Sequence, residues 1–337
     1  MRHWKLPVPL FFAALLPGCA AGPRPQAAAA AVVQQGPPTP VRTHGRLQVC
    51  GTRICDQAGR PVQLRGMSLF WSNTGWGGER FYDARVVGTL ADGWHATLVR
   101  AAMGIERGDN SANEARARAV VDAAIARGLY VIVDWHSHAP LQDEAVAFFS
   151  RMARDYADAP NVIWEPFNEP LRIDWSDELK PYHEAVIAAI RAAGSRNLVV
   201  AGTPSWSQDV DSAALDPIAG DGNVAYALHF YAGTHRQSLR DKAAFALERG
   251  AALFVTEWGS CDASGDRNFD PIESRLWLEW MDAHGISSAN WSLNDKAETA
   301  SALVPGARTA GPWPDAELTE SGRFARDYIS AGGAPVP

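Results

Sequence analysis

The strongest constraint on the fold is a regular alternation of apolar runs with segments of helical period. Eight apolar runs have the length of buried strands, at 62–67, 96–103, 129–134, 162–167, 198–201, 224–230, 253–257 and 287–292. Helix-period segments lie near 83–92, 114–127, 143–157, 176–193, 212–218, 239–249, 271–284 and 321–331. Eight such units predict an α/β fold, a parallel (β/α)8 TIM barrel.

The size of the chain fits one such barrel. At 337 residues and 47% hydrophobic composition it can bury a large core, and a typical barrel needs about 250 residues. No internal repeat and no second linker is visible. We therefore expect one barrel domain over residues 44–337.

The first residues have the pattern of an export signal. A short positive region precedes an apolar run at 6–16 that is too short to span a membrane. Leu16-Pro17-Gly18-Cys19 resembles a bacterial lipobox, so residues 1–18 are predicted to be removed and Cys19 lipidated; ordinary cleavage near Ala20 or Ala21 is the alternative. Residues 19–43 are rich in Ala, Pro and Gln and predict a flexible tether. We expect an exported protein, either an outer-membrane lipoprotein or a secreted one.

Charge and tryptophan content narrow the class of partner. The formal net charge is −7, the sequence pI is about 5.7, and the chain lacks the basic cluster with which nucleic-acid-binding proteins neutralise phosphates. Nucleic acid is therefore excluded, and contact with a membrane is expected only through a lipid anchor. Thirteen tryptophans suggest flat apolar platforms on which sugar rings stack.

The cysteines agree with export. Cys50 and Cys55 flank four residues, a spacing compatible with a cross-strand disulfide in a small N-terminal hairpin. Cys261 is left over. Two cysteines without a second pair or nearby histidines do not make a zinc site, and we expect no metal and no cofactor.

Two apolar runs end in a glutamate, and this feature carries the chemistry. One run leads into Asn168-Glu169-Pro170, and another ends at Glu257, followed by Trp258 and Gly259. Hydrolysis of a glycosidic bond needs two carboxyl groups, one to protonate the leaving oxygen and one to attack the sugar or activate water. In a barrel the site lies at the C-terminal ends of the strands, where further polar or aromatic residues also fall: Arg100, His136, His229, Tyr231 and Trp291.

Four motifs in order give a resemblance to a known family. They are IWEPFNEP at 163–170, LHFYAGTH at 228–235, VTEWG at 255–259 and NWSLNDK at 290–296. With these motifs the chain resembles glycoside hydrolase family 5, and specifically its bacterial endo-β-1,4-glucanase (cellulase) subfamily, from about residue 47 to residue 330.

The resemblance implies a role for each site residue. Glu169 is the expected general acid/base and Glu257 the nucleophile of a retaining reaction. Arg100 and Tyr231 would orient Glu257, Asn168 would bind the 2-hydroxyl of the sugar under attack, and His136 and His229 would line the cleavage subsite. The expected substrate-binding residues are Trp291, as the floor under that sugar, with Trp71, Trp206, Lys296 and Glu298 beside it.

Other residues of the motifs are given structural interpretations. Glu165 is interpreted as structural rather than catalytic, and His138 and His235 as loop or rim residues. Four tryptophans within strand or helix patterns are expected to pack in the core: Trp164, Trp258, Trp277 and Trp280. Four others lie among Gly, Ser, Asn and Pro, where a role in the cleft is as plausible as packing: Trp71, Trp76, Trp206 and Trp313.

The chain also departs from the subfamily pattern at two places. Phe70 stands before Trp71 where many relatives have a histidine, and Gly104 follows Met103 where relatives often have an aromatic residue. Both changes concern substrate subsites rather than the two glutamates. The expected function is that of a monomeric endo-β-1,4-glucanase acting on cellulose-type or mixed-linkage β-glucan; the alternative is a retaining hydrolase of mannan or xyloglucan. An inactive sugar-binding protein is disfavoured because both glutamates, Asn168 and Arg100 are present.

Overall fold

Eight parallel strands close into a barrel in the computed structural model, which describes Met1 and residues 38–332. In order around the barrel the strands are β10, β3, β4, β5, β6, β7, β8 and β9. Their bounds are β3 Arg65–Leu69, β4 Leu98–Gly104, β5 Tyr130–His136, β6 Val162–Glu165, β7 Val199–Ala201, β8 Val224–Tyr231, β9 Leu253–Gly259 and β10 Ser288–Leu293. Each expected apolar run overlaps one of these strands, so the (β/α)8 barrel is confirmed.

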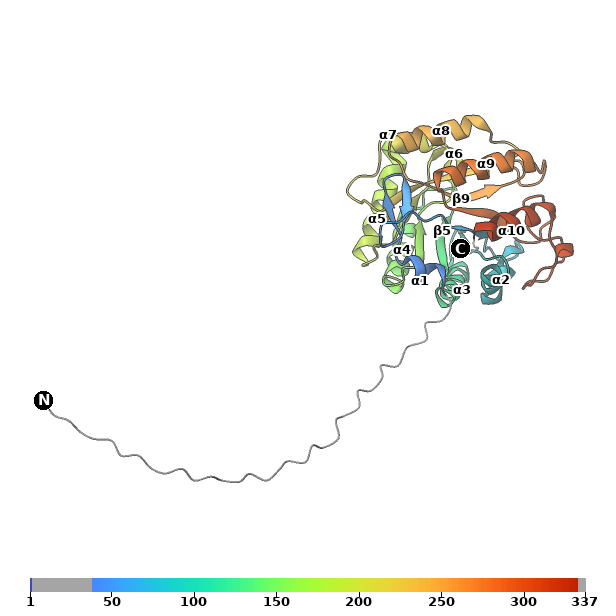
Figure 1. Ribbon diagram of the computed structural model, residues 1–337, viewed down its shortest axis with the longest axis horizontal. Helices are drawn as coiled ribbons and strands as arrows, with labels where there is room; N and C mark the ends of the chain where they lie inside the picture. Colours follow the sequence, from blue (N-terminus) through green and yellow to red (C-terminus); the bar gives the residue numbers. More distant parts are fainter. Residues whose placement is uncertain (2–37, 333–337) are drawn as a thin grey trace, which may run out of the picture. The chain divides into compact units, whose positions relative to one another are not determined.

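Helices surround the strands (Figure 1). The main helices are α2 Ala84–Gly93, α3 Ser111–Arg127, α4 Gln142–Asp155, α5 Lys180–Ala192, α7 Val210–Leu215, α8 Gln237–Glu248, α9 Pro271–His284 and α10 Glu320–Gly332. Four shorter pieces are η1 Gly78–Phe81, η2 Trp175–Leu179, α6 Pro204–Ser207 and η3 Asp315–Glu317. Only η2 overlaps a helical segment expected from the sequence, that at 176–193, and the other three were not expected.

Local sequence explains where the helices begin and end. The side chain of Asp83 accepts a hydrogen bond from the backbone of Arg85 at the start of α2, and Asp270 does the same for Glu273 at the start of α9. Gly128 ends α3 in the left-handed conformation that glycine adopts at low cost. None of the helices in the described part of the chain is both long and apolar enough to cross a bilayer.

Alternation along each strand divides the core into two layers. On β4, Val99, Ala101 and Met103 pack outward against the helices, whereas Leu98 belongs to the apolar cluster that fills the N-terminal half of the barrel. Arg100 shares the inward face with Leu98 and lies one layer closer to the C-terminal end. The lower layer is therefore apolar and the upper layer carries charge.

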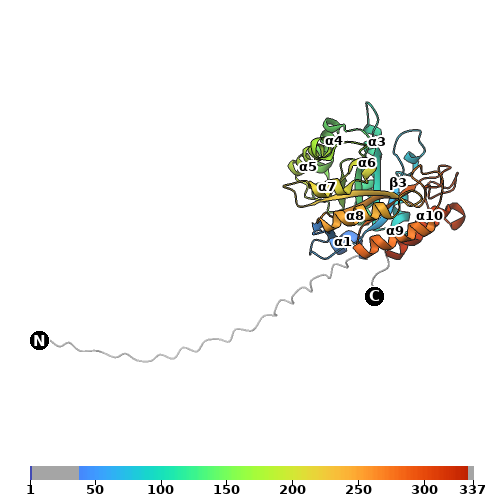
Figure 2. The same ribbon diagram turned by 90° about the horizontal axis from the view of Figure 1, so that it is seen from above.

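The N-terminal end of the barrel is covered by a short helix and a hairpin. Helix α1 (Pro40–His44) lies at the lower edge of the barrel in Figure 2, and the backbone N–H of Val41 donates to the carbonyl of Gly128. The hairpin consists of β1 (Gln48–Cys50) and β2 (Arg53–Cys55), and a disulfide joins its two cysteines.

The folded domain thus begins earlier than the sequence suggested. Residues 40–43 were assigned to the tether, but they form most of α1, because Pro40 starts a helix that Thr39 caps with its side chain. The expected signal segment, Cys19 and the rest of the tether up to residue 37 lie outside the described residues.

A glycine on β3 tests how tightly the barrel is closed. A Cβ atom on Gly66 would lie 1.9 Å from the backbone oxygen of Leu98 on β4, a position from which neither strand can retreat. We expect Gly66→Ala to cost on the order of 3 kcal/mol of unfolding free energy or more, measured by urea denaturation. Gly222→Ala is the matched control, since nothing lies within 4 Å of its Cβ, and it should change stability by less than about 0.5 kcal/mol. Equal stability of the two variants would contradict this packing.

Candidate active site

Arg100 is the centre of a buried cluster at the C-terminal end of the barrel. Its side chain is completely buried. Nε donates to Oε2 of Glu165 at 2.7 Å, and Nη1 donates to Oε2 of Glu257 at 2.9 Å. Nη2 donates to Oδ1 of Asn168 at 2.6 Å and lies 2.9 Å from Oδ2 of Asp134. Burial disfavours the charge on Arg100, but the surrounding carboxylates outweigh it and raise its pKa well above the ordinary value.

A bulge in β9 turns Glu257 toward this cluster. Ala227 on β8 pairs with Phe254, but His229 pairs with Glu257, so β9 contains one extra residue between the two pairs. Phe254 points into the barrel and Val255 points outward, and strict alternation would therefore direct Glu257 outward as well. The extra residue reverses this direction, which is a usual effect of a β-bulge.

Tyr231 holds the second oxygen of Glu257. Its hydroxyl donates to Oε1 of Glu257 at 2.6 Å. Burial and the Glu257 charge keep the pKa of Tyr231 well above its ordinary value, so the hydroxyl retains its proton. Burial and the Glu169 carboxylate raise the pKa of Glu257, whereas His229, Arg100 and Tyr231 favour its ionised form. Glu257 is therefore oriented on both oxygens, as a nucleophile requires.

Glu169 lies in the loop after β6 and is held by His229. Nδ1 of His229 is 2.9 Å from Oε1 of Glu169, and its Nε2 is 2.8 Å from the hydroxyl oxygen of Thr256. Thr256 in turn donates to Glu165 at 2.6 Å. Burial opposes a charge on His229, but Glu165 and Glu169 raise its pKa to about 9, so both ring nitrogens carry protons at neutral pH.

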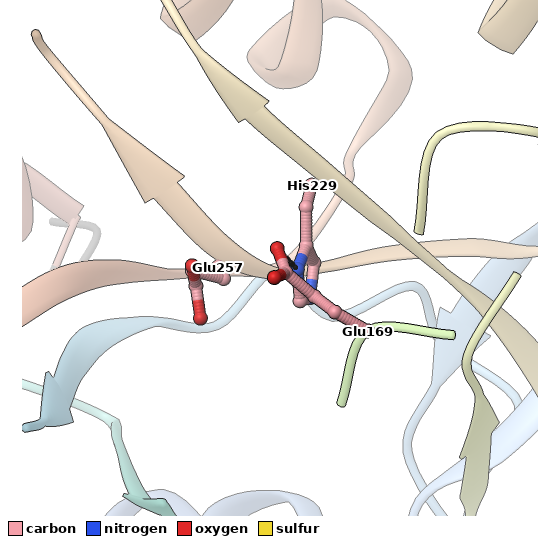
Figure 3. Close-up of side chains that lie close together, drawn as sticks. All are labelled: Glu169, His229 and Glu257. Atoms are coloured by element: carbon pink, nitrogen blue, oxygen red, sulfur yellow. Dashed lines mark hydrogen bonds and ion pairs between the residues drawn. The ribbon is translucent and has the colours of Figure 1, made fainter. Parts of the chain in front are cut away.

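The two glutamates face one another across a short gap. One oxygen of Glu169, one oxygen of Glu257 and one ring nitrogen of His229 all lie within 4.8 Å of one another. Figure 3 shows the Glu169 carboxylate against the His229 ring, with Glu257 approaching from the other side. A separation of about 5 Å is that of retaining glycosidases, whereas inverting enzymes need about 6.5–9.5 Å to admit a water molecule.

His136 and Trp291 form a stacked pair beside the glutamates. Their rings lie 5.1 Å apart and are nearly parallel, with an interplanar angle of 1°. Nδ1 of His136 lies 2.5 Å from Oδ2 of Asp134. Burial and the nearby Arg100 lower the pKa of His136 well below its ordinary value, so the ring is neutral.

Two cavities meet at this centre. The first has a volume of about 500 Å³ and is lined by residues that include Trp71, Trp291, Lys296 and Glu298; Lys296 and Glu298 form an ion pair at 2.6 Å. The second, of about 510 Å³, is lined by residues that include Glu169, His229 and Trp206. Tyr231 lines both cavities. The structure thus brings all the proposed substrate-binding residues to the walls of two cavities that share Tyr231.

A larger cavity, of about 600 Å³, lies at the other end of the barrel. Arg46, Arg191, Arg196 and Asp221 are among its lining residues, and no pair of carboxyl groups faces it. We therefore place the chemistry at the C-terminal end, where the glutamates are.

The tryptophans divide between packing and the cleft. Trp164, Trp258 and Trp277 are buried, and Trp280 packs against Trp277. Trp76 is 55% exposed and lies 5.3 Å from Trp71, both rings lining the first cavity. The suggestion of a cleft role for Trp313 is wrong: it is 5% exposed, packs edge-on against Trp94 and donates to the carbonyl of Arg308.

Three polar residues of the site were missed or undervalued in the sequence. Glu165 is a buried partner of Arg100 and so helps to position the group that contacts Glu257, rather than serving the fold alone. Asp134 contacts both Arg100 and His136, and Thr256 joins His229 to Glu165. The available signal was that each lies on the inward face near a strand end, where a buried polar side chain needs a polar partner.

The Cys261 thiol and one group of possible cation ligands are two further candidates for a reactive centre. Burial raises the pKa of the Cys261 thiol to about 12, so it is not a thiolate at neutral pH. Within residues 38–332, Glu169, His229 and Glu257 form the one group with a ligand set for a cation. Both nitrogens of His229 are already engaged by Glu169 and Thr256, which favours the carboxyl groups acting directly.

Comparisons with known proteins agree on one family. The model of the cellulase family (glycosyl hydrolase family 5) matches residues 55–297. Endoglucanase Z of Dickeya dadantii (strain 3937) is 50% identical over 293 residues, which cover 85% of this chain and 66% of that protein. An endoglucanase of Clostridium saccharobutylicum is 41% identical over 298 residues, covering 85% and 65%. The chain thus spans slightly less than two thirds of the length of these relatives.

Solved structures give the same picture. A structure from Cytophaga hutchinsonii has a TM-score of 0.85 and 48% identity, and the match covers 88% of this chain and 98% of that one. The catalytic domain of Thermobifida fusca endoglucanase Cel5A, as a variant in complex with cellotetraose, has a TM-score of 0.81 and 32% identity, with 87% and 99% covered.

The pKa of His229 predicts a pH dependence of stability. Because folding raises this pKa from 6.5 to about 9, the stabilisation is complete below pH 6.5 and is lost as the pH rises through about 9. Urea unfolding of the wild type should therefore lose up to about 3 kcal/mol over this range. His229→Gln cannot be protonated and should lack this component. Parallel pH profiles for the two proteins would contradict the assignment.

Proposed function

The chain belongs to glycosyl hydrolase family 5, and we propose that it is an endo-β-1,4-glucanase that hydrolyses internal bonds of cellulose-type or mixed-linkage β-glucan with retention of configuration. The observation that carries this proposal is the approach of Glu169 and Glu257 to within 4.8 Å, together with the donors that hold each carboxyl group. Relatives named as endoglucanases and the cellotetraose complex of a structural neighbour support the substrate class.

The geometry supports a two-step reaction. In the first step an oxygen of Glu257 bonds to C1 of the sugar while the C1–oxygen glycosidic bond breaks, and the leaving oxygen takes the proton of Glu169. In the second step water attacks C1, Glu169 takes a proton from that water, and the bond between Glu257 and C1 breaks. Two inversions at C1 restore the original configuration.

The surrounding residues reduce the barrier by orientation and charge. Arg100 and Tyr231 fix both oxygens of Glu257, so the attacking oxygen needs little rearrangement. Arg100 also engages the side-chain oxygen of Asn168, which leaves the NH₂ group of that amide to donate to a sugar hydroxyl. Trp291, stacked on His136, presents an aromatic face to the sugar.

Cavities on both sides of the glutamates favour cleavage within a polymer. The first cavity contains Trp71 and Trp76, the second contains Trp206, and Tyr231 lines both at the centre. A chain can therefore occupy sugar-binding positions on each side of the broken bond. We further propose that the enzyme acts as a monomer, because one chain supplies every residue of this site.

A substrate panel combined with a nucleophile variant tests the proposal. We expect wild-type protein to release reducing ends from carboxymethyl cellulose and lichenan, and little from mannan or xyloglucan. Glu257→Gln keeps the shape but cannot form the covalent intermediate, so kcat should fall by at least about 10³-fold. Glu248→Gln, an exposed substitution at the end of α8, is the matched control and should be fully active. A preference for mannan or xyloglucan would show that the substrate is one of these polysaccharides instead of β-glucan. Substantial activity of Glu257→Gln would show that Glu257 is not the nucleophile.

We also propose that the protein is exported and anchored to the outer membrane by a lipid on Cys19. The support is the sequence alone: a positive region, a short apolar run and the Leu-Pro-Gly-Cys motif, with Ala rather than Asp after the cysteine. An anchored enzyme would act on glucan near the cell surface.

Cys19→Ser tests the anchor without touching the barrel. In a Gram-negative host the wild type should fractionate with outer membranes and incorporate labelled palmitate, whereas Cys19→Ser should incorporate none. Glucanase activity per mole should be equal in both. A soluble wild-type protein whose mature N-terminus lies beyond Cys19 would show ordinary secretion instead.

A further inference from the structure

One contact of Glu169 is not explained by the roles above. Oε1 of Glu169 is engaged by His229, but Oε2 has no hydrogen bond within the described part of the chain. Nδ1 of His138 lies 3.8 Å from Oε2. The same nitrogen lies 3.2 Å from the backbone oxygen of Glu169. A carbonyl oxygen only accepts, so Nδ1 of His138 carries a proton.

The two segments that carry these residues are fastened together. The backbone N–H of Glu169 donates to the carbonyl of Ser137, and that of Asn168 donates to the carbonyl of Trp135. The Ser137 hydroxyl oxygen accepts from the backbone N–H of Ala139, which fixes the turn around His138. The His138 side chain is 40% exposed, and its ring lies 5.7 Å from that of Trp71.

The free oxygen is the one that must exchange the proton. Oε1 accepts a hydrogen bond from the protonated His229 and is therefore poorly placed to carry a proton of its own. Oε2 is then the oxygen that delivers the proton to the leaving group and recovers one from water. From these contacts we propose that His138 is a positioning residue for the acid/base: its Nδ1–H holds the backbone of Glu169 and directs Oε2 toward the reacting oxygen. This inference rests on the proposed glucanase function.

The proposal predicts which steps depend on His138. Cleavage of a glucan needs the proton of Glu169, and so does the attack of water on the covalent intermediate. Formation of the intermediate from a 2,4-dinitrophenyl cellobioside does not need it, because this leaving group departs without protonation. Azide attacks the intermediate without losing a proton, so it bypasses the second requirement.

The test compares three substitutions at His138. His138→Ala should lower kcat on cello-oligosaccharides about tenfold with KM within about twofold. With the dinitrophenyl substrate its burst rate should equal that of the wild type, its steady-state rate should fall, and azide should restore that rate. His138→Asn keeps an N–H donor near the position of Nδ1 and should remain within about threefold of wild type. His138→Phe keeps a ring against Trp71 without the donor and should behave like His138→Ala.

Each contrary outcome has a distinct meaning. If the wild-type protein is inactive on every glucan, the proposed function is wrong and this inference is wrong with it. If the wild type is active, three results would overturn the inference about His138 and leave the proposed function intact. They are an unchanged activity of His138→Ala, equal losses of its burst rate and steady-state rate, and full activity of His138→Phe. His95→Asn is the control: His95 is exposed at the opposite end of the barrel, just before β4, in a left-handed conformation that Asn tolerates, and the variant should match wild type.

Discussion

Arg100 is a buried cation that contacts groups from four strands and one loop, including the hydroxyl of Ser68 on β3. Asp134 comes from β5, Glu165 from β6, Asn168 from the loop after β6, and Glu257 from β9. A charge in this position is tolerated only because its donors meet acceptors. Removing Arg100 would leave several buried carboxyl groups without a cation, a kind of change that typically costs about 3–5 kcal/mol. The planar guanidinium serves several acceptors at fixed angles, which a lysine cannot do. The orientation of Glu257, the proposed nucleophile, and the stability of the upper barrel layer therefore depend on the same interactions.

A second cation completes the balance of charge. His229 is protonated and faces Glu169 through Nδ1. Glu165 lies between the two cations: it accepts a hydrogen bond from Arg100 and another from Thr256, whose hydroxyl oxygen is in turn hydrogen-bonded to His229. Burial alone would raise the pKa of Glu165, but Arg100 and His229 lower it below its ordinary value. For Asp134, burial and the charges of Glu165, Glu257 and Glu169 raise the pKa well above its ordinary value, although Arg100 opposes this. Glu165 thereby couples the proposed nucleophile Glu257 to the proposed acid/base Glu169, so substitutions at these sites should not be additive.

The sequence predicted the barrel and most of the site for simple reasons. Eight apolar runs with helices between them leave few alternatives to a closed parallel sheet. Because the strands are parallel, polar residues at their C-terminal ends all lie at the same end of the barrel. The bulge in β9 was not predictable, because one extra residue changes pairing with β8 without changing the apolar run, and Glu257 was placed by its motif rather than by alternation. Glu165 was undervalued because the sequence of a single strand does not reveal that Arg100, two strands away on β4, contacts it. Trp313 was misjudged because Gly and Pro around a tryptophan mark a turn, and a turn can still fold back over Trp94.

Both ends of the described domain lie at the face opposite the glutamates. Val41 of α1 is bonded to Gly128, just before β5 begins, and the end of α10 at Gly332 lies against Arg65, the first residue of β3. The cleft is lined by residues at the C-terminal ends of strands and in the segments that follow them. A fused polypeptide or a solid support joined to either end would therefore meet the barrel on its closed face, and a bulky polymer could reach the open face without steric conflict.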